Sequence, residues 1–342
     1  MRAPPPLSSQ TVVITGASSG IGRCTARLLA ALGARTVVTS RRADALAELV
    51  GEIERAGGHA LAVAGDVTSE ADVRAVARAA VDRFGGIDTW VNNAAVYLQA
   101  PVERTVLDEY RRLLEVNLLG YITGTKCALE VMRRRGAGGV ICVSSIVARR
   151  AAAYNSAYSA SKMALDGFVQ ALRTELWGCD ITVSTVYLPS VDTPVYRHAR
   201  GKLGTVPKPP PPVGDPMAAA RAIAKLAERP QPELVVGGFG RLYASLPWLP
   251  PRAVDWFLHH TAGFTRSDIP ADGDNFEHPL SDRPRERDGW SRRGWRGWTV
   301  GETVRVLPVE SAIATAVGLG VLGSVVRRVR RVSRRAAARR RR

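Results

Sequence analysis

The residues best suited to chemistry are Tyr158 and Lys162, four positions apart in the run YSASK. On a helix, positions i and i+4 share a face, so the phenol and the ammonium group are expected to lie side by side. A free tyrosine has a pKa of about 10, which is too high for ready proton exchange at neutral pH. A neighbouring lysine cation stabilises the phenolate, and the tyrosine can then protonate a carbonyl oxygen or deprotonate an alcohol. The spacing therefore predicts Tyr158 as a general acid and base.

Two further polar residues are candidates to complete this site. Ser145 closes the predicted strand 140–144, at the end of a parallel sheet where ligands bind, so its hydroxyl is predicted to bind the substrate oxygen. Asn117 lies in a long predicted helix over 107–135. Tyr154, one helical turn before Tyr158, is either a tyrosine without a role in the site or part of the wall of the substrate pocket. Taken singly, each of these residues also has an ordinary structural role, as a surface side chain, a strand-end cap or a buried polar group.

A glycine-rich turn, TGASSGIG over residues 15–22, predicts a nucleotide site. It follows the β-branched run 11–15 and opens a predicted helix over 20–33. Glycine tightens the turn and lets backbone amides approach a pyrophosphate at the helix N-terminus, although such turns also occur without ligands. The predicted cofactor contacts in this turn are Gly16, Ser18, Ser19, Gly20 and Ile21.

The elements that must position these residues alternate along the chain. Short apolar runs at 11–15, 36–40, 60–64, 87–92, 140–144, 181–187 and 233–236 are separated by helical patterns. Strands joined by single helices form right-handed crossovers in a parallel sheet. The predicted fold class is therefore α/β, with a doubly wound, mostly parallel, seven-stranded Rossmann sheet.

Taken together, the motifs resemble the short-chain dehydrogenase/reductase family over residues 10–237. Besides the glycine turn and YSASK, the family's marks appear in order as Asp66-Val67, the run NNAA over 92–95, Asn117 and Ser145. The run NNAA has Ala95 where the family has Gly. After the strand at 181–187, Leu188 and Pro189 stand where the family has Pro and Gly.

The resemblance implies an enzyme that moves a hydride between a nicotinamide cofactor and a carbonyl or alcohol. It implies that Lys162 also binds the nicotinamide ribose, that Asn117 serves a water-mediated proton relay, and that the chain forms homo-oligomers. The catalytic set it implies is Asn117, Ser145, Tyr158 and Lys162. Further cofactor contacts that it implies are Asp66 and Val67 near the adenine, Asn93, Tyr158, Lys162, Val191 and Thr193.

The cofactor is predicted to be NADP(H) rather than NAD(H). An NAD site usually has an acid at the end of the second strand to hold the ribose 2′-hydroxyl, whereas an arginine accommodates a 2′-phosphate. Here Ser40 takes the acid's position and Arg41 follows. The alternative is that Arg41 merely covers a helix start, where the helix dipole disfavours a cation.

The substrate is predicted to be a small carbonyl or alcohol with apolar character. Leu188, Tyr196 and the proline-rich segment 190–215, interpreted as a loop across the substrate site, suggest an apolar pocket. The intact set of four catalytic residues favours an active enzyme. The alternative is a catalytically idle cofactor-binding or membrane-scaffold protein on the same fold.

The chain is predicted to divide at residue 240. Residues 8–240 form the catalytic domain, and 241–303 form an irregular extension rich in Trp, Pro and Arg, poorly ordered over 270–300. Residues 304–342 combine an apolar stretch with an arginine run, which predicts contact with a membrane; the alternative is a packed helix and a solvated tail. Nucleic acid is an unfavoured partner because the tail lacks aromatic residues between its arginines.

The charge and the cysteine content of the chain limit which other functions and locations are expected. The net charge is +17, and 10 of the positive charges are arginines in 327–342, so the basic character belongs partly to the tail. The four cysteines lack metal-ligand spacing, which predicts no metal site. The N-terminus shows no secretory signal, and together with unpaired cysteines this predicts a cytoplasmic protein, membrane-associated through its C-terminal segment.

Overall fold

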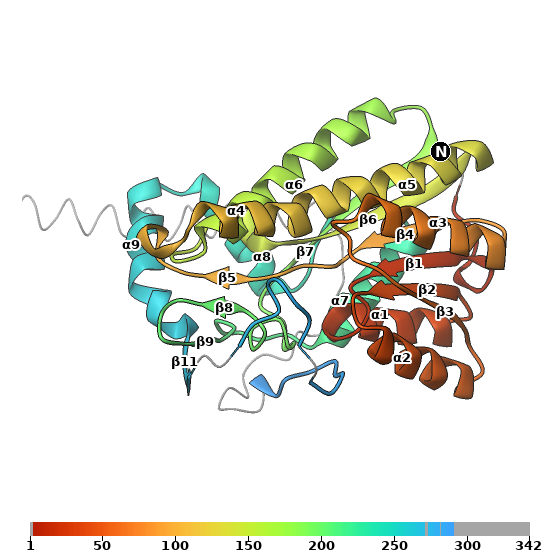
Figure 1. The fold of residues 1–342 in the computed structure, drawn as a ribbon. Coiled ribbons are helices and arrows are strands. Elements are labelled where there is room, and N and C mark those ends of the chain that lie inside the picture. Colours follow the sequence, from red (N-terminus) through yellow and green to blue (C-terminus); the bar gives the residue numbers. More distant parts are fainter. Residues whose placement is uncertain (1–2, 271–272, 281, 291–342) are drawn as a thin grey trace, which may run out of the picture. The chain divides into compact units, whose positions relative to one another are not determined.

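The computed structural model describes residues 3–270, 273–280 and 282–290. Within them, seven strands form one parallel sheet in the order β10-β7-β6-β4-β1-β2-β3, which confirms the predicted fold class (Figure 1). The strands are β1 Thr11–Thr15, β2 Arg35–Ser40, β3 His59–Ala64, β4 Thr89–Asn92, β6 Ala137–Ser145, β7 Asp180–Leu188 and β10 Glu233–Val235. The predicted apolar stretch and arginine run of 304–342 lie outside the described residues.

Helices cover both faces of this sheet (Figure 1). Alternate residues of β1 point to opposite faces, so Val12 and Ile14 join one apolar core and Val13 joins the other. The first core includes α1 Gly20–Ala31, α2 Ala43–Arg55 and α7 Pro216–Glu228. The second includes α3 Glu70–Phe84, α5 Gly120–Arg135 and α6 Ser156–Glu175. Burial on both faces explains why the strands read as continuous apolar runs.

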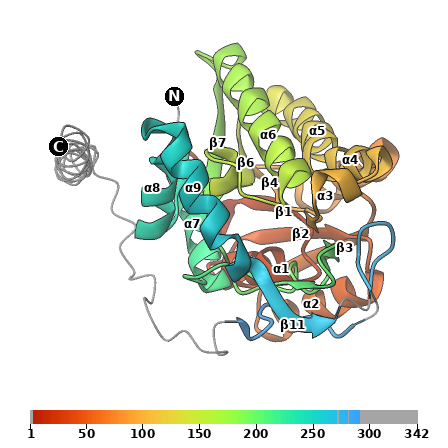
Figure 2. The same ribbon diagram turned by 90° about the vertical axis from the view of Figure 1, so that its left-hand side faces the viewer.

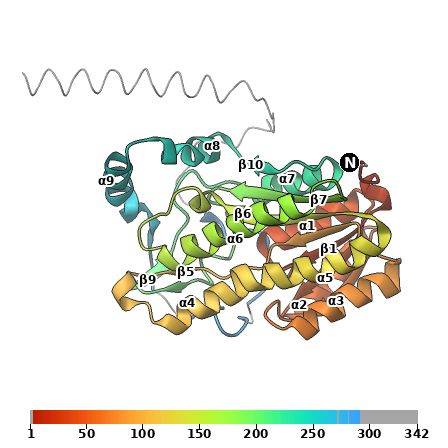
Figure 3. The same ribbon diagram turned by 90° about the horizontal axis from the view of Figure 1, so that it is seen from above.

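The helix predicted over 107–135 is continuous but changes its winding (Figure 3). It comprises α4 Leu107–Leu114, a π-helical turn over Glu115–Leu119 and α5. Such single π turns are often found at functional sites. This one contains Asn117.

The prediction of an irregular extension after residue 240 is wrong for part of that segment. Helices α8 Gly238–Ala244 and α9 Pro251–Thr261 form there, and α9 leads to β11 Arg266–Pro270, which pairs with β9 Thr205–Pro207 (Figure 2). Proline is tolerated in the first helical turn because the amide at that position has no intrahelical partner. Pro250 and Pro251 therefore begin α9 instead of preventing it.

The segment after β11 is irregular in backbone, and two aromatic side chains of its described residues are buried. Phe276 is fully buried and Trp290 nearly so. Residues 190–215 include β9 and β8 Arg200–Gly201, which pairs with β5 Leu98–Gln99. Within the described part of the chain, no helix is long and apolar enough to span a bilayer. The same residues hold no cluster of three potential metal ligands.

Candidate active site

The glycine turn packs against the end of β4 so closely that side chains are excluded. A Cβ on Gly16, which has φ +67°, would lie 2.7 Å from the Cα of Ala94, and one on Gly22 would lie 2.4 Å from the Gly16 carbonyl oxygen. Asn93 braces the turn, because its Nδ2 donates to the carbonyl oxygen of Thr15 at 2.8 Å. The turn thus leaves the backbone amides at the start of α1 free of covering side chains, as close approach of a dinucleotide pyrophosphate requires.

One large cavity of about 990 Å³ joins this turn to the predicted catalytic residues. It reaches from Arg41 and Asp66, past Tyr158, to α8 and α9. The predicted residues that line it are Gly16, Ser18, Ser19, Gly20, Ile21, Arg41, Asp66, Val67, Asn93, Ser145, Tyr158, Lys162, Val191 and Thr193. Its size is at the upper end of ordinary ligand pockets, which suits a dinucleotide together with a substrate.

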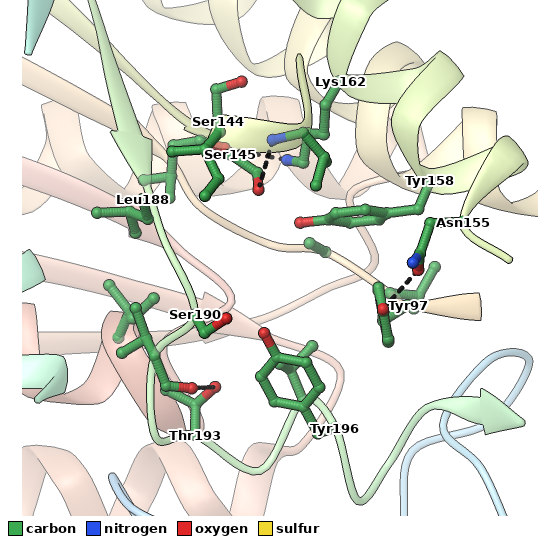
Figure 4. A pocket seen from close by; sticks show the side chains of 18 of the residues that line it. Tyr97, Ser144, Ser145, Asn155, Tyr158, Lys162, Leu188, Ser190, Thr193 and Tyr196 are labelled. Carbon is green, nitrogen blue, oxygen red and sulfur yellow. Dashed lines mark hydrogen bonds between the residues drawn. The ribbon is translucent and has the colours of Figure 1, made fainter. Parts of the chain in front are cut away.

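Tyr158 extends into this cavity toward Ser145 (Figure 4). Its ring meets that of Tyr97 edge-on, with 4.9 Å between the ring centroids. Burial raises the pKa of the phenol well above its ordinary value, and Tyr196 adds to the rise, whereas a hydrogen bond with the Ser145 side chain opposes it. In the protein alone, therefore, the Tyr158 phenol keeps its proton at neutral pH.

Lys162 is buried behind Tyr158, with only 2% of its surface exposed. Its Nζ donates to the carbonyl oxygen of Val143 at 3.0 Å and to the hydroxyl of Tyr121 at 3.3 Å. Burial lowers the pKa of the ammonium group to about 8. In the protein alone, burial raises the pKa of Tyr158, and the expected lowering by Lys162 is not among the effects on the phenol.

Asn117 lies away from the cavity wall and holds the backbone of Val96. Its Oδ1 accepts from the Val96 amide at 2.9 Å, and its Nδ2 donates to the Val96 carbonyl at 3.0 Å. The side chain is fully buried, and it is absent from the described residues that line the cavity. This pairing fixes the chain directly after NNAA. The relay that the resemblance implies for Asn117 stays a prediction.

At the other end of the cavity, Arg41 is held by the segment after β11. Its guanidinium donates to the carbonyl oxygens of Glu277 at 2.7 Å and Asn275 at 2.8 Å. Asp66 accepts from the amide and hydroxyl of Thr68, both at 2.9 Å. Arg41 and Asp66 therefore stand together at one end of the cavity, with strand ends and a C-terminal segment around them.

Several residues of the cavity wall were not found from the sequence. Tyr97 and Asn155 are joined by a hydrogen bond, and Tyr196, taken from the sequence only as an apolar residue, lies beside Ser190 in the same cavity (Figure 4). None of these residues belongs to a recognisable motif. Apolar side chains of α8 and α9 complete the wall: Phe239, Leu242, Tyr243, Val254, Phe257 and Leu258.

Tyr154 is set apart from Tyr158 by its position. It lines a second cavity, together with residues of 100–104 and Arg266, and has φ +61°. Leu188 and Pro189, the departures from the family pattern, line the main cavity beside Ser190. The structure thus places Tyr154 in a different cavity from Tyr158 and outside the wall of the main cavity.

Comparison with known proteins gives a consistent result. Residues 10–203 match the family model described as short chain dehydrogenase. The chain is 36% identical to "Uncharacterized oxidoreductase YxnA" of Bacillus subtilis, over 73% of this chain and 71% of that protein. It is 30% identical to "Ketoacyl reductase HetN" of a Nostoc species, over 73% of this chain and 90% of that protein. It is 34% identical to "Trans-4-hydroxycyclohexanecarboxylate dehydrogenase" of Sinomonas cyclohexanicum, over 59% of this chain and 80% of that protein.

Proposed function

Since this chain belongs to the short-chain dehydrogenase/reductase family, we propose that it is an NADP(H)-dependent oxidoreductase that interconverts a carbonyl and a secondary alcohol. The observation that carries the proposal is that Tyr158, Ser145 and Lys162 lie together in the wall of the cavity that begins at the glycine turn. Family membership supports an oxidoreductase with a nicotinamide cofactor; the cofactor preference and the reaction are our inference.

The roles of the protein's own residues follow from their chemistry. When bound, the nicotinamide supplies or accepts the hydride. Reduction of a carbonyl also requires one proton on its oxygen, and Tyr158 is positioned to donate it; oxidation of an alcohol runs the transfer in reverse. Ser145 holds the same oxygen through its hydroxyl. The buried ammonium of Lys162 keeps positive charge near the phenol, which favours the phenolate as the proton leaves.

NADP(H) is the proposed cofactor because of the end of β2. Ser40 and Arg41 both line the cavity, so this strand end presents a hydroxyl and a guanidinium where an NAD site has a carboxylate. The two carbonyl contacts of Arg41 fix the orientation of its guanidinium and leave further N–H donors for a 2′-phosphate.

The proposed substrate is apolar around its carbonyl or carbinol carbon. Beyond Tyr158 the cavity continues along α8 and α9, where the wall is aliphatic and aromatic, with Tyr97, Asn155 and Tyr196 as the nearby polar groups. Burying apolar surface of a substrate there is favourable by about 25 cal/mol for each Å². The name of the Nostoc relative, a ketoacyl reductase, is consistent with a ketone on an apolar chain.

From the sequence alone we also propose that the chain forms homo-oligomers and contacts membranes through 304–342. The apolar stretch followed by arginines suits an anionic lipid surface. Flotation of the full chain and of a chain ending at 303 with anionic vesicles tests this contact, which is rejected if both behave alike.

The function is tested by a screen of ketones, aldehydes and secondary alcohols, with the phosphorylated and unphosphorylated cofactors run in parallel. We expect turnover of bulky apolar ketones or alcohols with NADPH or NADP⁺. Cofactor binding without turnover of any compound would favour the catalytically idle alternative. Turnover with NADH alone would reject the cofactor preference and leave the reaction intact.

A further inference from the structure

The described residues after β11, 273–280 and 282–290, are here called the strap; it is drawn in blue in Figure 1. We propose that the strap is a part of the cofactor site that closes over the bound dinucleotide, so that the cofactor exchanges only when the strap opens. The proposal rests on the family's use of a nicotinamide cofactor and not on the preference for NADP(H).

The first part of the strap lies at the end of the cavity with Arg41 and Asp66. The carbonyl oxygens of Asn275 and Glu277 accept from Arg41, and that of Phe276 accepts from Arg112 at 3.2 Å. The Phe276 side chain is fully buried in an apolar cluster that Val67 borders. This part of the strap is therefore anchored to the residues expected around the adenosine.

The strap also forms part of the cavity wall itself. Asn275, Pro279 and Leu280 line the cavity that Arg41 and Asp66 line. A dinucleotide placed along this wall would touch the strap as well as the sheet. The outer side of the cleft at these positions is thus built by a segment that the family match, residues 10–203, does not include.

The middle of the strap reaches the glycine turn. The amide of Gly20 donates to the carbonyl oxygen of Arg285 at 2.9 Å. Next to it, Glu286 accepts from Arg27 of α1 at 2.8 Å. Helix geometry leaves the amides of Ile21 and Gly22 without an intrahelical partner, so these remain for a phosphate. Gly20, predicted as a cofactor contact, gives its amide to the strap instead.

The last part of the strap is joined to the loop that carries Val191 and Thr193. The carboxylate of Asp192 accepts from the amides of Asp288 at 3.2 Å and Trp290 at 2.9 Å. Arg197 donates to Asp288, whose side chain is 1% exposed, at 2.9 Å. The strap therefore begins at the end of the cavity with Arg41 and Asp66, passes the glycine turn and ends at the loop that carries Val191 and Thr193. These are the places expected for the adenosine, the pyrophosphate and the nicotinamide.

The strap has two features that favour its opening: little regular secondary structure and anchoring ion pairs that are partly exposed. Its described residues up to Gly289 form no helix or strand, and local unfolding is easiest where such structure is lacking. Several of its anchors are ion pairs with partly exposed partners, including Arg27 with Glu286 and Arg287 with Asp215. Pairs of this kind weaken as salt rises. Cofactor release should therefore become faster at higher ionic strength.

Stopped-flow displacement of NADPH, followed by its fluorescence, tests the proposal on the full chain. Asp288→Asn weakens the anchor to Arg197, and Phe276→Ala removes the apolar anchor. We expect each to raise the dissociation rate at least tenfold, because the loss of one charge-assisted hydrogen bond or of one buried phenyl ring weakens the closed state by at least that factor. Glu130→Gln, which alters an exposed ion pair with Arg74, is the control and should leave the rate unchanged.

Limited trypsin digestion gives a second readout that does not depend on activity. Arg285 and Arg287 are exposed in the strap, and neither precedes a proline. Saturating cofactor should slow cleavage at these sites in wild type, and the two strap variants should lose this protection.

Two results would overturn the proposal. One is a dissociation rate within twofold of wild type in both strap variants, together with cleavage that the cofactor does not slow. The other is faster association with unchanged dissociation, because the strap would then obstruct the cleft instead of closing over the cofactor. If NADH binds and NADPH does not, the same measurements run with NADH; only the proposed cofactor preference would fail.

Discussion

Lys162 donates to the carbonyl oxygen of Val143 at 3.0 Å, while its Nζ stands 5.9 Å from the ring centroid of Tyr158. The ammonium group is therefore tied to the end of β6 and influences the phenol from the side of the ring. Because burial lowers its pKa to about 8, its charge changes within the range in which the enzyme can be assayed. Two predictions follow from this arrangement.

The first concerns activity. As pH rises through about 8, Lys162 loses its proton in the free enzyme, and with it goes the positive charge proposed to favour proton release from Tyr158 and to bind the cofactor. We expect kcat/KM for the cofactor to fall above that pH, since this ratio reports groups of the free enzyme. A pH profile of initial rates measures it. A ratio that stays level up to pH 10 would contradict the assignment.

The second concerns stability. A lysine whose pKa is lower in the folded state than in the unfolded state binds fewer protons when folded between about 8 and 10.4. Stability contributed by this group therefore rises with pH across that window. The free energy of unfolding is measured by urea denaturation of wild type and Lys162→Met at pH 7.5, 8.5 and 9.5. As pH rises, the free energy of unfolding of wild type should increase relative to that of the variant. If the free-energy difference between the two proteins does not change with pH, the lowered pKa of Lys162 is rejected.

Asn117 is predicted to act as a positioning residue. Asn117→Ala leaves the buried amide and carbonyl of Val96 without their partner, which costs about 1–3 kcal/mol for an unsatisfied group. We expect the free energy of unfolding and kcat to fall together. Full stability with lost activity would instead indicate that the side chain takes part directly, as the relay requires. Urea unfolding and steady-state kinetics on one preparation distinguish the two.

The end of β2 is predicted to set the cofactor preference. Ser40→Asp places a carboxylate where the 2′-phosphate is expected, and Arg41→Ala removes a charged donor. A charge-assisted hydrogen bond contributes about 1.5–3 kcal/mol, so each change should raise KM for NADPH roughly 10- to 100-fold and leave that for NADH much less affected. Because Arg41 also holds the strap, Ser40→Asp is the cleaner variant. Equal effects on both cofactors would count against a phosphate site.

The sequence was sufficient for the elements whose pattern is local. The parallel sheet could be predicted because β1, β2 and β4 are buried on both faces and therefore continuous in apolar residues. The glycine turn and Tyr158 could be predicted because their spacings are fixed by backbone geometry. The cavity then brings these separate segments together.

Other features depend on contacts between distant residues and had no local signal. The partners of Arg41 are backbone carbonyls more than 230 positions away, which no spacing rule can reveal. The hydrogen bonds of Asn117 with Val96 could also be found only from the fold. In the sequence, an asparagine at this position fits a proton relay and a structural hydrogen bond equally well. Helix α9 was missed because the tryptophans after residue 240 are interspersed with proline, arginine and glycine, a composition that predicts irregular structure.

The central claim is that Tyr158 transfers the proton, and one comparison tests it most directly. The rate of NADPH oxidation with a reactive ketone is measured for wild type, Tyr158→Phe and the control Tyr154→Phe, whose ring lies in the second cavity. General acid catalysis contributes on the order of 10²- to 10⁴-fold, so Tyr158→Phe should lose at least a hundredfold in kcat while Tyr154→Phe stays near wild type. Equal rates for wild type and Tyr158→Phe would contradict the account.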